Sequence, residues 1–304
     1  MKKLFVSALL LGASVFGYAQ LLNVASVEKV ALPEGVSVNQ ATMSPDGSYI
    51  AITQNQKAGI QKLDLATKSI TTISETGHGY GLTISNDGQQ VFFRENTIGA
   101  DRLRRTSLKS ANVVTGRTST LIKATRDLQG VAINDNAIMT VNKGQLSTKA
   151  LSTKATAVAT PVASIDKGRL MVTVNGKTTN ISPQGSDCKS YLWPSISPDG
   201  TRVCYYLSGV GCYVCNLDGS NPVYLGKVRA AQWYDNATVV GMNDIDNGEV
   251  VTSSKIVAAS ADGKLGQNLT ADASMGMYPT VSRDGAKIAY STPNGELYII
   301  NIAK

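Results

Sequence analysis

The sequence offers few residues for nucleophilic or acid–base catalysis. His78 is the only histidine, so a Ser-His-Asp triad would have to use it. It stands between Gly77 and Gly79, a setting typical of an ordinary loop residue. The chain has no Gly-x-Ser-x-Gly nucleophile elbow and no glycine-rich phosphate-binding loop. Catalysis by a pair of carboxylates stays possible, because a sequence does not show which acidic side chains lie close together in space.

Four cysteines crowd into one window of the chain, at Cys188, Cys204, Cys212 and Cys215. The last two have the spacing of zinc and redox motifs, but their alternating surroundings predict a strand and no second ligand pair is near. We therefore expect no metal and no cofactor. If Leu207 and Cys212 flank a hairpin turn, Cys204 and Cys215 face each other across the two strands. A cross-strand disulfide is strained, so both the bonded and the reduced forms stay open.

The most acidic segment is residues 243–249, which contains Asp244 and Asp246. It does not fit a calcium-binding loop, because aligning Gly248 with the glycine of that template puts Ile245 at a ligand position. We favour a solvated turn over a calcium site.

The strands that would position these candidate residues are joined by a turn that repeats along the chain. In Ser197-Pro198-Asp199-Gly200, proline presets φ for the first corner of a type I turn, and aspartate suits the second corner. Glycine takes the left-handed position that follows, so the turn joins two antiparallel strands. Related turns begin at Ser44, Ser85 and Ser282, and we call these three and Ser197 the anchor serines.

The spacing of the anchor serines indicates a repeat. Their gaps are 41, 112 and 85 residues, close to one, three and two periods of roughly 40 residues, a length typical of propeller blades. A second landmark, the end of an alternating third strand, follows at Asp64, Asn216 and Asn301. Such a unit is one four-stranded blade, and blades must stack around an axis to bury both of their faces.

This repeat resembles that of TolB-type β-propellers and is similar to the propellers of prolyl-oligopeptidase-like enzymes. The resemblance covers the chain from about Asn39 onward. It implies an all-β propeller, and a protein partner in the cell envelope.

We predict six blades over residues 20–304. The stretch from Gly130 to Lys177 is counted as one long blade, because Asp166 and its turn lie too close to Ser197 for a full period; two short blades there would make seven. The final blade has three strands, and the weakly alternating segment from Asn23 to Leu32 has no partner of its own. We therefore expect the N-terminal strand to close the last blade and remove a sheet edge.

The first 19 residues predict a secretory signal peptide. Lys2 and Lys3 precede a short apolar run, and Gly17-Tyr18-Ala19 provides small residues for cleavage before Gln20. We therefore expect an exported, periplasmic or extracellular protein with no membrane span. Loss of the two lysines would lower the formal charge from +7 to +5, a balance that does not require a nucleic-acid partner.

Propellers bind ligands at the mouth of the central channel, and the repeat alignment brings five residues near it: His78, Tyr80, Tyr191, Trp193 and Tyr278. Trp193 and Tyr278 each precede a proline and stand four residues before an anchor serine. Either they form an aromatic collar for a ligand, or they pack between neighbouring blades. Asp244 and Asp246 are expected to border the same face.

The outer half of the second blade is basic. It predicts either a docking surface for an acidic envelope polymer or, as we favour, a sheet edge guarded by charge. The cations are Arg102, Arg104, Arg105, Lys109, Arg117 and Lys123.

Two functions remain open. We favour an exported, non-catalytic and monomeric binding propeller for an envelope or extracellular protein, with a glycan as another ligand. The alternative is a small propeller hydrolase or lyase that acts on a glycan or lactone in the channel. A carboxylate cluster in the channel would favour the enzyme, and an aromatic rim without one would favour binding.

Overall fold

The computed structural model describes residues 20–54, 59–75, 79–134, 137–151, 160–185 and 190–304. Over these residues the chain forms 26 strands and one short 3-10 helix, Asp272–Ser274, so the all-β prediction is confirmed. The expected signal peptide, residues 1–19, lies outside the described residues.

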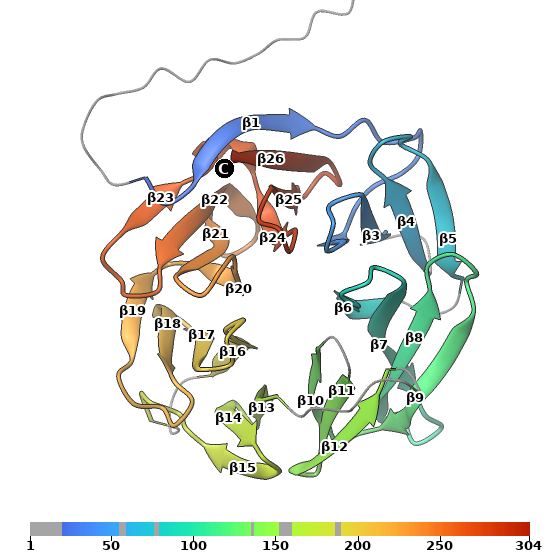
Figure 1. The fold of residues 1–304 in the computed structure, drawn as a ribbon, viewed down its shortest axis with the longest axis vertical. Helices are drawn as coiled ribbons and strands as arrows, with labels where there is room; N and C mark the ends of the chain where they lie inside the picture. The colour runs from blue at the N-terminus through green and yellow to red at the C-terminus, as the bar shows by residue number, and fades with distance from the viewer. Residues whose placement is uncertain (1–19, 55–58, 76–78, 135–136, 152–159, 186–189) are drawn as a thin grey trace, which may run out of the picture.

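The strands form seven antiparallel sheets that stand around a central axis as blades (Figure 1). Four blades are built from four consecutive strands each. They are blade one, β2 (Gln40–Met43), β3 (Tyr49–Thr53), β4 (Ile60–Asp64) and β5 (Ile70–Ser74); blade two, β6 (Gly79–Ile84), β7 (Gln90–Ile98), β8 (Arg104–Asn112) and β9 (Thr118–Thr125); blade five, β16 (Tyr191–Ile196), β17 (Arg202–Leu207), β18 (Gly211–Asn216) and β19 (Val223–Gly226); and blade six, β20 (Arg229–Trp233), β21 (Thr238–Asp246), β22 (Val251–Ser260) and β23 (Gly266–Asn268).

The stretch expected to form one long blade forms two short ones, so the prediction of six blades was wrong. Each has three strands among the described residues. Blade three contains β10 (Leu128–Ile133), β11 (Ala137–Asn142) and β12 (Gln145–Ala150), and blade four contains β13 (Val162–Asp166), β14 (Arg169–Val174) and β15 (Lys177–Asn180). The turn near Asp166 lies close to Ser197 because blade four is short. The gaps between the four anchor serines correspond to one, three and two repeat periods. These add up to six periods between the first and last anchors, which corresponds to seven blades.

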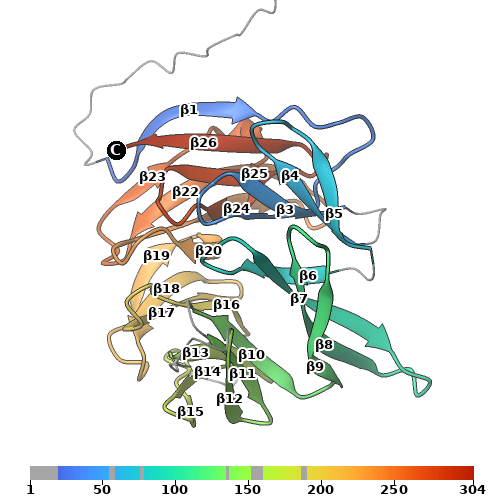
Figure 2. The same cartoon turned by 45° about the vertical axis from the view of Figure 1, so that its right-hand side comes forward.

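The N-terminal strand closes the ring, as expected. Blade seven contains β24 (Met277–Val281), β25 (Lys287–Ser291) and β26 (Leu297–Ala303), and β1 (Asn23–Lys29) is its fourth strand. β1 runs antiparallel to β26, with Val24 opposite Ile302 and Lys29 opposite Tyr298. Figure 2 shows the two strands side by side along one edge of the molecule.

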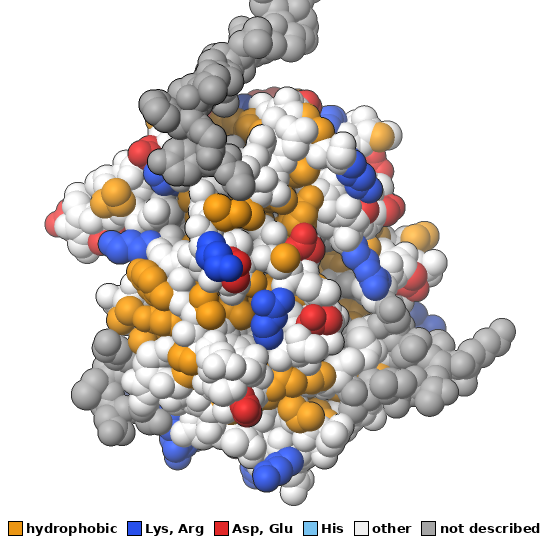
Figure 3. Space-filling model, turned by 60° about the vertical axis from the view of Figure 1, so that its left-hand side comes forward, with side chains coloured by type: hydrophobic (Ala, Val, Ile, Leu, Met, Phe, Trp, Pro, Cys, Tyr) orange, Lys and Arg blue, Asp and Glu red, His pale blue; other side chains and the backbone are white. Residues whose placement is uncertain are grey.

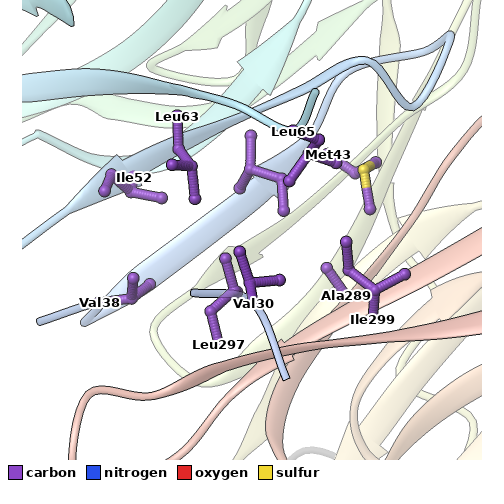
Figure 4. Close-up of a cluster of buried hydrophobic side chains, with 10 residues drawn as sticks. Val30, Val38, Met43, Ile52, Leu63, Leu65, Ala289, Leu297 and Ile299 are labelled. Atoms are coloured by element: carbon purple, nitrogen blue, oxygen red, sulfur yellow. The ribbon is translucent and has the colours of Figure 1, made fainter. Parts of the chain in front are cut away.

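The core is divided into seven hydrophobic clusters, one between each pair of neighbouring blades. The cluster between blades seven and one joins Leu297 and Ile299 to Ile52 and Leu63, and Val30 from the chain after β1 completes it (Figure 4). Each blade is therefore apolar on both faces, which explains why no blade is stable alone. On the surface drawn in Figure 3, hydrophobic side chains lie in separate groups among charges of both signs.

The anchor serines organise the turns as the sequence predicts. The Ser197 hydroxyl donates to Asp199 Oδ1 at 2.6 Å and accepts from the Arg202 amide at 3.0 Å, while Gly200 has φ of 73°. The same two bonds recur at the other three anchor serines. One serine thus fixes both sides of a hairpin turn.

The cysteine register differs from the prediction. Leu207 pairs with Gly211, one residue earlier than expected, so Cys204 faces Val214 and not Cys215. A slip of one residue exchanges the two faces of a strand. Cys204 and Cys212 therefore share the interface of blades five and six, with sulfur atoms 3.5 Å apart, while Cys215 is buried between blades four and five. These three are free thiols, and burial raises the pKa of Cys215 to about 12; Cys188 lies outside the described residues.

Candidate functional site

The innermost strand of each blade begins on one face of the ring, which we call the mouth face. Antiparallel pairing puts the turns between second and third strands there too, at residues 99–103, 247–250 and 292–296. The Ser-Pro-Asp-Gly turns lie on the opposite face.

Trp193 and Tyr278 occupy equivalent β-bulges on the mouth face. The register of β16 shifts between Leu192 and Ser195, and that of β24 between Met277 and Thr280. Within the bulges, Trp193 has φ of 47° and Tyr278 has φ of 48°. This left-handed conformation costs a residue with a side chain about 1–2 kcal/mol. Gly81 and Ala230 stand at the matching positions of blades two and six and are also left-handed.

The strained conformation leaves both aromatic side chains in contact with solvent. Trp193 is 37% exposed and Tyr278 is 44% exposed. The Trp193 ring contacts Tyr206 edge to face at 5.6 Å between centroids, and the Arg229 guanidinium lies 5.5 Å above it. Arginine over an indole face is a cation–π contact worth about 0.5–1 kcal/mol at an exposed site. Trp193 is therefore fixed along one edge while much of the ring stays accessible.

Arg229 is held by Asp244, one of the two acidic residues that the sequence singled out. The Arg229 guanidinium forms an ion pair with Asp244 Oδ2, and the Asp244 side chain is 1% exposed. Asp244 belongs to β21 and not to a loop, because β21 and β22 extend toward the mouth face. A buried carboxylate paired with one arginine fixes the position of that arginine.

Tyr278 joins the same group of residues through blade six. Its backbone amide donates to the Met242 sulfur at 3.4 Å, and Met242 pairs with Arg229 across the sheet. Tyr278 also lines a pocket of about 350 Å³ with Val250, Pro293 and others. Trp193, Arg229, Asp244, Met242 and Tyr278 thus form one connected group across blades five, six and seven, which we call the aromatic site.

Comparison of the fold with solved structures identifies its type. No family profile matches the sequence, and no curated protein matches it. A chain from a crystal structure of the mitotic checkpoint complex has a TM-score of 0.63 at 9% identity, over 97% of this chain and all of that one. TolB from Acinetobacter baumannii has a TM-score of 0.50 at 14% identity, over 76% of this chain and 53% of TolB. Oligogalacturonate lyase in complex with manganese has a TM-score of 0.48 at 14% identity, over 89% and 79% of the two chains.

The chain has the β-propeller fold of these structures, TolB among them. At these identities the likeness concerns the fold alone, so the site is argued from this propeller's own residues.

The other four sequence-predicted residues lie apart from the aromatic site or outside the described part. Tyr191 is wholly buried, and its hydroxyl accepts from the Gln184 amide and donates to the Gly185 carbonyl at 2.9 and 3.0 Å. It is a core residue of blade five, and the expectation that it faces a ligand was wrong. Asp246 ends β21 and is exposed, where it accepts from the Gly248 amide. His78 lies outside the described residues, as does the side chain of Tyr80, whose backbone pairs with Arg94 in β6.

Arg229 and Met242 were missed in the sequence because neither belongs to a repeated motif. Their placement opposite each other depends on a bulge in β20, between Arg229 and Gln232, that has no clear signature in the sequence.

Among the described residues, no group of three or more His, Cys, Asp or Glu side chains could hold a metal ion. No helix in the described part is long and apolar enough to cross a bilayer.

Proposed function

We propose that this propeller is an exported, non-catalytic binding protein that engages an envelope or extracellular protein through the aromatic site. The observation that carries the proposal is the pair Trp193 and Tyr278. Both hold an unfavourable backbone conformation, and both expose the aromatic ring instead of burying it. Strained residues persist where surrounding structure imposes them, and they cluster at binding sites.

The chemistry of the site suits a protein partner. Trp, Tyr and Arg are the residue types most enriched among binding hot spots, since they offer large contact areas with little side-chain freedom to lose. The Arg229 side chain lies over the Trp193 ring and is 34% exposed. The pocket beside Tyr278 is bordered by Val250 and Pro293 and suits an apolar side chain of the partner.

The arrangement favours binding over catalysis. Asp244 is the buried carboxylate of the aromatic site, and it is committed to an ion pair with Arg229. A general acid or base must reach the reacting atoms of a substrate. In this proposal Asp244 positions Arg229, and through it Trp193, because the ion pair and the cation–π contact link the three.

The test is the binding of the Trp193→Ala and Tyr278→Ala variants to proteins captured from the cell envelope by the unaltered propeller. Each variant should weaken binding by about 2 kcal/mol, roughly 30-fold, as expected of a hot-spot residue. Tyr224→Ala is the matched control, because Tyr224 is 49% exposed but lies on the outer strand β19. The mass of the protein isolated from the envelope should correspond to a chain that begins at Gln20.

Melting temperatures separate binding from packing. If Trp193 acted only as a wedge between blades, its loss would lower stability by about 3 kcal/mol or more. A folded Trp193→Ala variant that binds as tightly as the unaltered protein would overturn the proposal.

A further inference from the structure

A second pocket opens on the mouth face, at blades two, three and four. It has a volume of about 660 Å³. β7, β8 and β9 contribute one wall, and the innermost strands β10 and β13, which lie next to each other in Figure 1, contribute another. A volume of this size is typical of small-molecule sites, which fall between about 300 and 1,000 Å³.

Three arginines line this pocket: Arg94 from β7, Arg104 from β8 and Arg126 from the connection between β9 and β10. Thr106, Thr125 and Gln129 line it as well and provide hydrogen-bonding groups between the cations. Among the described residues that line the pocket, none is acidic.

The nearby carboxylates are committed to other cations. Asp101 binds Arg105 through two bonds of 2.7 and 2.8 Å, Glu95 forms an ion pair with Lys109, and Asp127 pairs with Lys143 at 3.4 Å. Within the described part of the chain, Arg104 and Arg126 form no ion pair. Like charges gathered at a concave surface create a positive potential that attracts anions.

We propose that this pocket binds a small polyanion, a molecule with two or more carboxylate or phosphate groups. Guanidinium groups match the planar, two-oxygen geometry of carboxylate and phosphate, and Arg104 and Arg126, which form no ion pair among the described residues, favour a ligand with two such groups. Gln129 accepts from the Gly144 amide through Oε1, and its Nε2 can donate a further hydrogen bond to the same oxygens. The sequence favours a charged sheet edge for the basic residues of blade two. For Arg104 we propose a ligand-binding role instead, because its side chain lines a pocket on the mouth face.

The polyanion site is separate from the aromatic site. Its walls come from blades two to four, whereas Trp193, Arg229 and Tyr278 come from blades five to seven. The two approach each other only at Pro194, which lines the polyanion pocket and follows Trp193 in the chain. Loss of binding at one site therefore does not require loss at the other.

The test is calorimetric titration of the protein with citrate and with pyrophosphate, which distinguish a carboxylate from a phosphate ligand, and with acetate as a single charge. We expect saturable 1:1 binding of citrate or pyrophosphate and far weaker binding of acetate. Arg104→Gln and Arg126→Gln should each weaken binding by about tenfold, as loss of one charged hydrogen-bonding group predicts. Arg126→Lys, which keeps the charge but not the planar fork, should lie between.

Arg117→Gln is the matched control. It removes the same charge from the same blade, but Arg117 is exposed in the turn between β8 and β9 on the opposite face, and its loss should change binding less than twofold. Trp193→Ala should bind polyanions normally, so failure of the aromatic site and failure of this site are told apart. Equal weakening by Arg117→Gln and Arg104→Gln, or no saturable binding of either polyanion by the folded protein, would refute the proposal.

Discussion

In two anchor turns, at Asp199 and Asp284, a serine partner lowers the pKa of the aspartate. The hydroxyl of Ser197 holds the pKa of Asp199 below its usual value, and Ser282 does the same for Asp284. A related turn in blade six has Ser260 bonded to Asp262, whose pKa is lowered to about 2. These carboxylates accept hydrogen bonds only in the folded chain, so folding favours their charged form.

We therefore expect stability to fall in acid. A carboxyl whose pKa is lower when folded than when unfolded adds stability above the unfolded value, near 4, and that stability is lost as the pH falls through the folded value. The denaturant midpoint should be constant between pH 7 and 5 and should decrease steadily from pH 4 to 2. The Asp199→Asn variant keeps an acceptor oxygen but cannot titrate, so its midpoint should fall less over this range. An identical pH profile in both proteins would show that Asp199 contributes nothing to acid sensitivity.

At this scale the sequence predicts what depends on local chemistry. The glycines of the Ser-Pro-Asp-Gly turns are left-handed as expected, with φ of 66° at Gly47 and 73° at Gly200. The burial of Tyr191 and Asp244 could not be predicted, because each depends on partners far along the chain or in another strand. For Asp244 that partner is Arg229, 15 residues away across a hairpin.

Among the secondary-structure elements, β1 is anchored by three hydrogen bonds with the Gln267 side chain of blade six, which we call the clasp. Gln267, in the outermost strand of blade six, accepts from the amides of Leu21 and Leu22 at 2.9 and 2.8 Å. Its Nε2 donates to the Leu22 carbonyl at 2.8 Å. The clasp fixes the chain where it enters β1, and Leu22 is buried between blades six and seven.

We expect Gln267→Ala to lower the free energy of unfolding by about 2–3 kcal/mol, because it removes three hydrogen bonds of about 1 kcal/mol each. Gln267→Glu keeps the acceptor but loses the donor, so it should have an intermediate effect. Chemical denaturation of the three proteins measures the difference. If Gln267→Ala unfolds at the unaltered midpoint, the clasp adds nothing to the anchoring of β1.

Strand register was predictable only where the turn length was clear. The hairpin after Leu207 has a loop of three residues, 208–210, and the sequence reading assumed one residue more. This difference of one residue in loop length is the reason that Cys204 lies next to Cys212 and not opposite Cys215. The equivalence of Trp193 and Tyr278 was visible in the sequence, since each precedes a proline, but the bulges and their left-handed backbone were not.

For the molecule as a whole, the ring depends on the seam between blades seven and one. β1 covers the edge of β26, the Met43 amide donates to the Thr280 hydroxyl at 3.0 Å, and Lys287 donates to the Gly47 carbonyl at 2.9 Å. Val30 packs in the hydrophobic cluster of this seam. The seam therefore combines strand pairing, side-chain hydrogen bonds and apolar packing.

Deletion of residues 20–34 should open this seam. It exposes the edge of β26 and removes Leu22 and Val30 from the core, so we expect a marked drop in melting temperature and aggregation through the free edge. A chain that begins at Gln20 is the control and should melt like the unaltered protein. Addition of a peptide of residues 20–34 should restore part of the lost stability. A truncated protein that stays monomeric and melts at the unaltered temperature would contradict the role of β1.

The propeller and its closure were predictable because repeat spacing and an unpartnered strand are both visible in the sequence. The predicted number of blades was wrong because blades three and four lack anchor serines and are short, although the anchor gaps together span six periods. Strand pairing puts β10–β12 and β13–β15 in separate sheets, and Met139 and Val141 pack against Val162 where the two meet.

The pairing of β1 with β26 also limits when the ring can close during synthesis and folding. Ser26 and Asn301 are hydrogen-bonded to each other although they stand 275 positions apart. β1 therefore has no partner strand until β26 has been synthesised, and a shorter growing chain cannot complete the ring. Contacts between such distant positions slow folding, and an unfinished chain exposes strand edges that invite aggregation. The ring can thus close only once β26 has been synthesised and can pair with β1.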